Sequence, residues 1–273
     1  AGATNVEVAL TAARGEAAIL PGERTAVWTY RGELIKGDAA SLQTVPNSYL
    51  GPIVRLRKGS RVRIRFRNDL PEPSTVHWHG LLVPDRMDGH PRDLVPAGGS
   101  YVYEFPVLNR AGTYWFHPHP HGRTGHQVYQ GLAGLFIVSD DEEARLDLPS
   151  GEYDVPLILQ DRTFDARNRL VYDAGNAGGM TGGHGHTMMS PSASTGGHGA
   201  MGGMMDRMMG FLGDRILING RPDFVLPVAT RAYRLRLLNG SNSRVYKLAW
   251  SHGAPVTVIA TDGLHRFRKR RCM

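Results

Sequence analysis

Short apolar and alternating runs, broken by glycine, proline and asparagine, fill the chain from Asn5 to Ser139. In the run RVRIRFRN, Val62, Ile64 and Phe66 alternate with four arginines, which predicts a strand with one buried face and one solvated, cationic face. The arginines are therefore expected on the surface. Seven or so such runs predict an antiparallel sandwich or barrel of the Greek-key kind.

A second set of strand-like runs follows the acidic, proline-containing segment DDEEARLDLPSGE. It begins with YDVPLILQDRTFD and resumes with DRILINGRPDFVLP and RAYRLRLLNGSNSR. We place a domain boundary near Ser150. The sequence thus predicts an all-β protein with one domain over residues 1–150 and a second, incomplete domain over residues 151–273.

The insertion at residues 175–213 interrupts the second domain with a strongly biased composition. It holds thirteen glycines, eight methionines and three histidines, which is typical of a low-complexity segment and not of a packed core.

Composition narrows the class of protein. Of 273 residues, 41% are hydrophobic, and no apolar run is long enough to suggest a membrane span. The formal charge of +7 falls to +2 without the five basic residues among the last eight, so nucleic acid is not an expected partner. Because the chain starts at Ala1 without a methionine or a leader, we expect a mature form from which an export signal has been removed. The single cysteine, Cys272, excludes an intrachain disulfide framework.

Two histidine pairs suggest metal chemistry. They occur in TVHWHG and in WFHPHPHG, and residues i and i+2 of a strand face the same side. Two such strands side by side would present four imidazoles to one face. Imidazole suits copper, zinc, nickel and iron, and the lack of matched carboxylates or cysteines favours copper. The alternative is that each histidine is an ordinary surface or core residue.

The same motifs resemble those of a known family. TVHWHGL, MDGHP, AGTYWFHPHPHG, GHQVYQGLAGLFIVSD, ILINGRP and RLRLLNGSNSR are similar to segments in the two amino-terminal domains of multicopper oxidases, most closely the bacterial periplasmic cuprous oxidase and laccase-like branch. The resemblance implies two cupredoxin-like domains here and three in a full family member. It also implies copper cofactors, a periplasmic or secreted location, dioxygen, and a reducing substrate such as Cu(I) or a phenol.

By this resemblance, His77 would bind the type 2 copper. His79 and His117 would bind one copper of the type 3 pair, and His119 the other.

Asp88 matches the acidic residue that helps deliver protons to dioxygen in the resembling branch. The alternative is a turn aspartate before Gly89. His90 and His121 have no ligand counterpart in the family, and we expect them to support ligands or to lie in loops.

The resemblance fails toward the carboxyl end. In the family, a further domain supplies a second HxH pair and an HCH segment whose cysteine binds the type 1 copper. Here Cys272 has no flanking histidines, so we expect no type 1 site. Without that site, we do not expect full turnover by this chain alone. We interpret residues 264–273 as an aberrant or truncated end, with a genuine basic tail as the alternative. Self-association or a missing carboxy-terminal domain would then complete the molecule.

The methionines and histidines of the insertion form a candidate Cu(I)-binding loop, because thioether sulfur is a soft ligand. The alternative is a short helix that packs a methionine face against the protein behind a flexible linker, and the two are compatible. The candidate ligands are Met180, His184, His186, Met188, Met189, His198, Met201, Met204, Met205, Met208 and Met209.

Together these features predict the amino-terminal part of a copper-dependent oxidoreductase, either laccase-like or a cuprous oxidase. A non-catalytic copper-binding or copper-tolerance protein is the alternative, and a metal-free scaffold is a third hypothesis.

Overall fold

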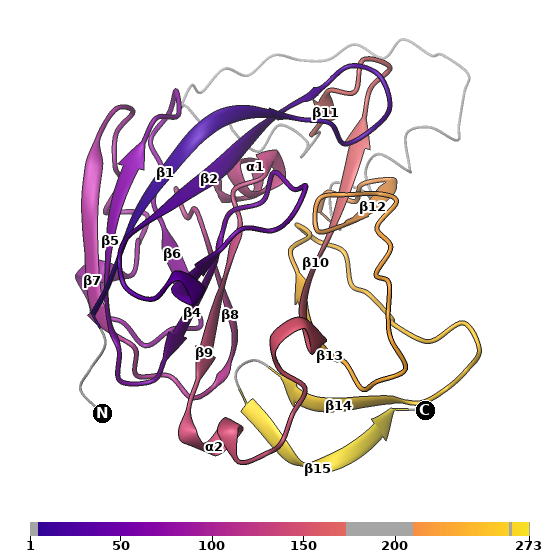
Figure 1. Cartoon of the computed structure of the whole chain (residues 1–273). Helices are drawn as coiled ribbons and strands as arrows, with labels where there is room; N and C mark the ends of the chain where they lie inside the picture. Colours follow the sequence, from indigo (N-terminus) through magenta and orange to yellow (C-terminus); the bar gives the residue numbers. More distant parts are fainter. Residues whose placement is uncertain (1–4, 173–209, 262–263, 273) are drawn as a thin grey trace, which may run out of the picture.

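Two facing sheets form the first half of the molecule (Figure 1). The computed structural model describes residues 5–172, 210–261 and 264–272. One sheet has the strand order β2 (Thr25–Lys36), β1 (Asn5–Ala17), β5 (Arg61–Asn68) and β7 (Ser100–Pro106). The other has the order β3 (Leu42–Gln43), β4 (Ile53–Arg57), β9 (Gly134–Ser139), β8 (Gly112–His117) and β6 (His77–His79).

One apolar core holds the two sheets together. Phe66 and Tyr103 come from the first sheet, and Trp78, Phe116 and Phe136 come from the second; all five are buried. The Trp78 ring lies 5.3–6.2 Å from its aromatic neighbours, within the range of favourable edge and tilted contacts. The prediction of an all-β sandwich is confirmed, and its sheets remain open.

The alternating run on β5 behaves as its pattern predicts. Its valine, isoleucine and phenylalanine are buried, and its arginines are exposed. Arg61 and Arg63 pair with Glu104 of β7, while Arg65 pairs with Glu7 of β1. Flanking carboxylates thus offset part of the positive charge on this face.

The strands are not all antiparallel, and in this respect the prediction was wrong. β1 runs parallel to β5, β4 runs parallel to β9, and each pair joins strands distant in the sequence. A period of two reports which face of a strand is buried but carries no information about the direction of its neighbour.

The second half is built on the long strand β10 (Asp154–Phe164). Strand β10 pairs with β11 (Leu170–Val171), β12 (Arg215–Ile218) and β13 (Arg234–Asn239), whereas β14 (Val256–Thr261) pairs with β15 (Leu264–Cys272) in a separate hairpin. The helices are α1 (Thr124–Gln130), α2 (Asp141–Ala144) and 3₁₀ turns at Ala39–Ser41, Asp85–Met87 and Gly151–Tyr153. None of the helices in the described ranges has the length and apolarity needed to cross a bilayer.

The two halves share a buried junction. Ile158 and Leu217 of the second half pack in one apolar cluster with residues of the first, including Ile53, Leu135 and Ile137.

Buried charges cross the same junction. Glu143 of the first half pairs with Arg234 and lies 3.4 Å from Arg236, both of the second half, and all three side chains are nearly inaccessible to solvent. Apolar packing and ion pairs thus connect the two halves. The domain boundary near Ser150 stays a prediction.

Gly134→Ala should lower the free energy of unfolding by about 1–3 kcal/mol, because the added methyl group overpacks the core. Gly134 of β9 lies opposite Phe116 of β8, and a Cβ at this position would overlap the Phe116 ring. Gly15→Ala on β1 is the matched control, since its Cβ would meet no atom closer than 3.5 Å. Urea unfolding of both variants is the measurement, and equal stability would contradict this account of the core.

Candidate metal centre

The pairing of β6 with β8 sets the site. His77 lies opposite His117, and His79 lies opposite Trp115. Between them, Trp78 lies opposite Phe116, and both of these rings point into the core. Because side chains alternate along a strand, burying Trp78 directs both histidines of β6 to the opposite face of the sheet.

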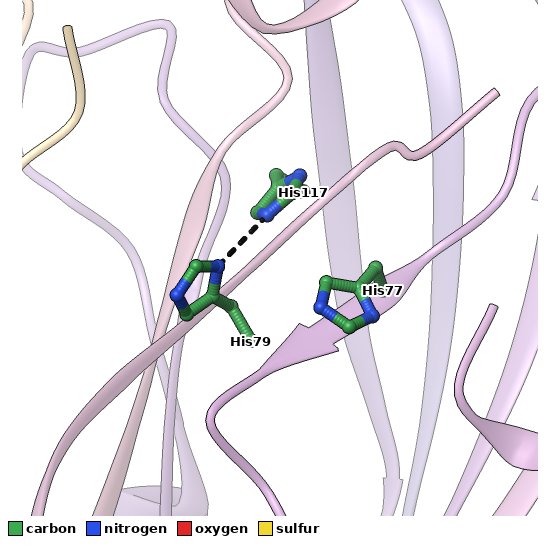
Figure 2. A group of neighbouring side chains, drawn as sticks. All are labelled: His77, His79 and His117. Carbon is green, nitrogen blue, oxygen red and sulfur yellow. Dashed lines mark hydrogen bonds between the residues drawn. The ribbon is translucent and has the colours of Figure 1, made fainter. Parts of the chain in front are cut away.

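Three imidazoles converge on that face. The potential ligand nitrogens of His77, His79 and His117 lie within 4.8 Å of one another. Figure 2 shows His79 and His117 facing each other, with Nδ1 of His79 3.2 Å from Nε2 of His117. Two imidazole nitrogens that share a tetrahedral ion at metal–nitrogen distances near 2.0–2.1 Å lie about 3.3 Å apart. The observed spacing therefore fits two ligands of one cation.

Backbone carbonyls orient two of the rings. Nδ1 of His77 is 2.8 Å from the carbonyl oxygen of Asp88, and Nδ1 of His117 is 2.9 Å from that of Pro118. Donation from Nδ1–H to these carbonyls leaves Nε2 of each ring as the metal-binding lone pair. Burial also lowers the pKa of His117 to about 3, so this ring stays neutral and ready to bind a metal.

His119 lies beside the three. Its ring centroid is 5.2 Å from that of His77 and 6.0 Å from that of His117. Its backbone N–H donates to Oγ1 of Thr75 at 2.9 Å, which ties the segment after β8 to the segment before β6. Within the described residues, its buried Nδ1 has no hydrogen-bond partner. An unsatisfied buried nitrogen next to three imidazoles fits a centre for an imidazole-binding metal such as copper.

Residues of helix α1 and its amino-terminal end hold the segment that leads into β6. The buried side chain of Gln127 accepts a hydrogen bond from Oγ of Ser74 at 2.8 Å and donates to Glu72 and to the carbonyl of Pro73. Arg123 pairs with the same Glu72 at 2.7 Å. These contacts fix the residues that lead into β6, including Thr75.

Asp88 is placed next to His77. One carboxylate oxygen is 3.3 Å from Nδ1 of His77, and the other is 3.7 Å from Nε2 of His90. His90 in turn lies 3.2 Å from Asp85, whose side chain is 68% exposed. Polar side chains therefore form a series from solvent to a candidate ligand.

Asp88 is also a turn residue, as the alternative interpretation had it. It follows the 3₁₀ turn Asp85–Met87 and precedes Gly89, which has φ +65° and no room for a Cβ against the backbone of Val76. The two interpretations are compatible, because the tight turn places both the carbonyl and the carboxylate of Asp88 next to His77.

The structure thus assembles His77, His79 and His117, sets His119 beside them, and leaves His121 exposed. The candidate Cu(I) ligands between Met180 and Met209 and the side chain of Cys272 lie outside the described residues.

Sequence reasoning missed the supporting groups. Thr75 and the carbonyl of Pro118 carry no motif of their own. Trp115 offered a signal, because it lies two residues before His117 in an alternating run and so shares its face.

Comparison with known proteins gives a consistent answer. The family profile described as "Multicopper oxidase" matches residues 18–143. The chain is 34% identical to "Multicopper oxidase mco" of Staphylococcus aureus over 85% of this chain and 45% of that protein. It is 31% identical to "Laccase" of Bacillus stratosphericus over 88% of this chain and 46% of that protein. The chain therefore spans about half the length of the curated relatives it matches.

One similar protein carries a different name, and a solved structure carries the family's name. "Cell division protein FtsP" of Escherichia coli is 31% identical over 93% of this chain and 44% of its own length. Among solved structures, the McoA multicopper oxidase from Aquifex aeolicus superimposes with a TM-score of 0.75 at 35% identity, over 97% of this chain and 50% of that one.

His79→Ala combined with His117→Ala should sharply lower the amount of bound copper and leave the fold intact, because the variant removes the two nitrogens that face each other at 3.2 Å. Copper retained after loading and desalting is the measurement, and circular dichroism reports the fold. His121→Ala and His252→Ala are matched controls, since both residues are exposed and lie outside the cluster. Unchanged copper stoichiometry in the double variant would refute the assignment.

The metal-free protein should lose stability as the pH falls from about 6.5 toward 3. The folded-state pKa of His117 is depressed, so the unfolded chain binds a proton in this window and the folded chain does not. One such group contributes a slope of up to about 1.4 kcal/mol per pH unit.

Urea unfolding in the presence of a chelator, at several pH values, measures this slope. His117→Gln should have a shallower slope than the unsubstituted protein. Parallel pH profiles would show that His117 does not resist protonation in the folded state.

Proposed function

The chain belongs to the multicopper oxidase family, and on this premise we propose that it is a copper-dependent oxidoreductase of the laccase-like or cuprous oxidase type. Such a protein couples one-electron oxidation of a reductant, Cu(I) or a phenol, to the reduction of dioxygen. The observation that carries the proposal is the convergence of His77, His79 and His117, with His119 beside them.

Each histidine has a proposed place. His77 would hold the type 2 copper, His79 and His117 one copper of the type 3 pair, and His119 the other. The facing nitrogens of His79 and His117 support the shared assignment of that pair. When bound, copper supplies the one-electron redox chemistry and the affinity for dioxygen. The protein's own part is to orient the imidazoles and to keep the buried His117 neutral.

Asp88 is proposed to hold and pass a proton at the edge of the site. Its carboxylate lies between His77 and His90, and Asp85 continues the series to solvent. A carboxylate at this position can take up a proton from the solvent side and present it to the ligand side.

The remaining parts of the active site would come from polypeptide outside these 273 residues. The chain covers 45% of the staphylococcal relative, and its one cysteine has no neighbouring histidine to form a His₂Cys site. We therefore propose that this chain contributes a histidine half-set, and that a further domain or a partner chain provides the electron entrance. A periplasmic or secreted location belongs to the same proposal.

A non-catalytic copper-binding or copper-tolerance role is the rival. The three converging histidines within the described residues come from the paired strands β6 and β8, and three imidazoles suffice to bind an ion without any electron entrance. Family membership does not decide between an oxidase and a non-catalytic role, because similar proteins include one named for cell division.

Oxygen uptake separates these functions. The copper-loaded protein at its native length, established by intact mass, should consume dioxygen with Cu(I) or a phenol faster than an equal amount of free copper does. His117→Ala should remove this activity, and His121→Ala should keep it. Copper binding without uptake above the free-copper rate would favour the rival role, and no copper binding would refute both.

Deletion of residues 178–209 should weaken Cu(I) binding and spare Cu(II) at the four histidines, since thioethers prefer the softer ion. The flanking rings of Tyr172 and Phe211 are in contact, with centroids 5.1 Å apart, so a short connector can rejoin the chain. Competition with a Cu(I) chelator measures the change. Equal Cu(I) affinity of the intact and deleted proteins would argue that the methionines are packing residues.

A further inference from the structure

Four side chains occupy one face of the β6–β8 pair as a two-by-two grid. The register places His77 against His117 and His79 against Trp115. Three corners are imidazoles whose nitrogens converge, and the fourth corner is an indole. Trp115 thus takes the position that a fourth imidazole would occupy on this face.

The indole contacts two of the three rings. The centroid of Trp115 lies 4.2 Å from that of His117 at 37° and 5.2 Å from that of His79 at 35°. The His77 ring meets its neighbours at about twice that tilt, 69° to His79 and 70° to His117. One indole therefore lies across the two rings whose nitrogens face each other at 3.2 Å.

We propose that Trp115 is a positioning residue that sets the metal affinity of the His79–His117 pair. This inference rests on the proposed copper role of the histidines. Contact with the indole limits rotation of both rings, so their nitrogens need little further ordering when an ion binds. A metal-bound imidazole also carries partial positive charge, which the electron-rich face of an indole attracts.

Trp115 differs from the other tryptophans in its contact with the histidine cluster. Trp78 faces the core, and Trp28 meets His126 edge-on at 85°, away from the cluster. Trp250 lines the same cleft as Trp115, but it is exposed, and its nearest imidazole is that of His252, at a centroid distance of 6.4 Å. Trp115 is only partly buried and lines a cleft together with His79, so its replacement should be tolerated better than loss of a core ring.

The test is copper binding by the full 273-residue chain. Trp115→Leu should weaken Cu(II) binding about tenfold in a chelator competition, whereas Trp115→Phe, which keeps a ring, should stay within about threefold of the unsubstituted protein. Trp28→Leu is the control, because it removes a partly buried indole from a tryptophan–histidine pair outside the cluster and away from the cleft. Its affinity should not change.

A second measurement avoids the risk that Trp115→Leu disturbs folding. Fluorinated tryptophans keep the shape of the indole but reduce the negative potential over its face. Their incorporation should lower copper affinity stepwise with the number of fluorines, and this trend should vanish in the Trp115→Phe background.

The outcomes separate two failures. Absence of copper binding by the unsubstituted protein would overturn the proposed function and this inference with it. If the unsubstituted protein binds copper and Trp115→Leu binds it with equal affinity, only the role of Trp115 is overturned. If Trp115→Leu is misfolded, copper affinity that does not change with fluorination overturns that role instead.

Discussion

The register between β6 and β8 is the constraint on which the candidate site depends. A slip of one residue would turn both histidines of β6 into the core and expose Trp78, because side chains alternate along a strand. Trp78 is fully buried among Tyr103, Phe105, Phe116 and Phe136, so the slip would lose this packing and bury unpaired imidazoles. Hydrophobic packing on one face of the sheet thereby sets the chemistry on the other.

The site also depends on keeping His117 neutral, which its burial achieves by lowering its pKa. Carbonyl acceptors at Asp88 and Pro118 leave Nε2 of His77 and His117 available. Because the most buried ring of the cluster carries no charge, it does not repel the other imidazoles before a metal arrives. At acid pH, His117 takes up a proton more readily in the unfolded chain, which lowers the stability of the fold.

The sequence predicted much of this arrangement, for physical reasons that also explain its limits. Alternation in RVRIRFRN and the spacing of His77 and His79 report strand faces directly, so the buried faces and the shared direction of this pair could be foreseen. The spacing of the second pair was less informative, because β8 ends at His117 and His119 lies beyond it. Strand direction could not, because β1 meets β5 and β4 meets β9 through contacts between distant segments. Supporting groups such as Thr75 and the Pro118 carbonyl escaped notice, since what matters is their position in space and not their chemical type.

Metal binding and turnover make different demands on this chain. The four candidate ligands lie between His77 and His119, within a sandwich that has its own core and takes its support from α1. All four candidate ligands therefore come from the first half of the described structure. Turnover further requires an electron entrance and a cover over the ligand face, and neither is built from the strands that carry the histidines. A preformed half-set of ligands is therefore consistent both with an oxidase completed by further polypeptide and with a protein that only binds copper. The rate of dioxygen reduction distinguishes these two, whereas affinity for the metal does not.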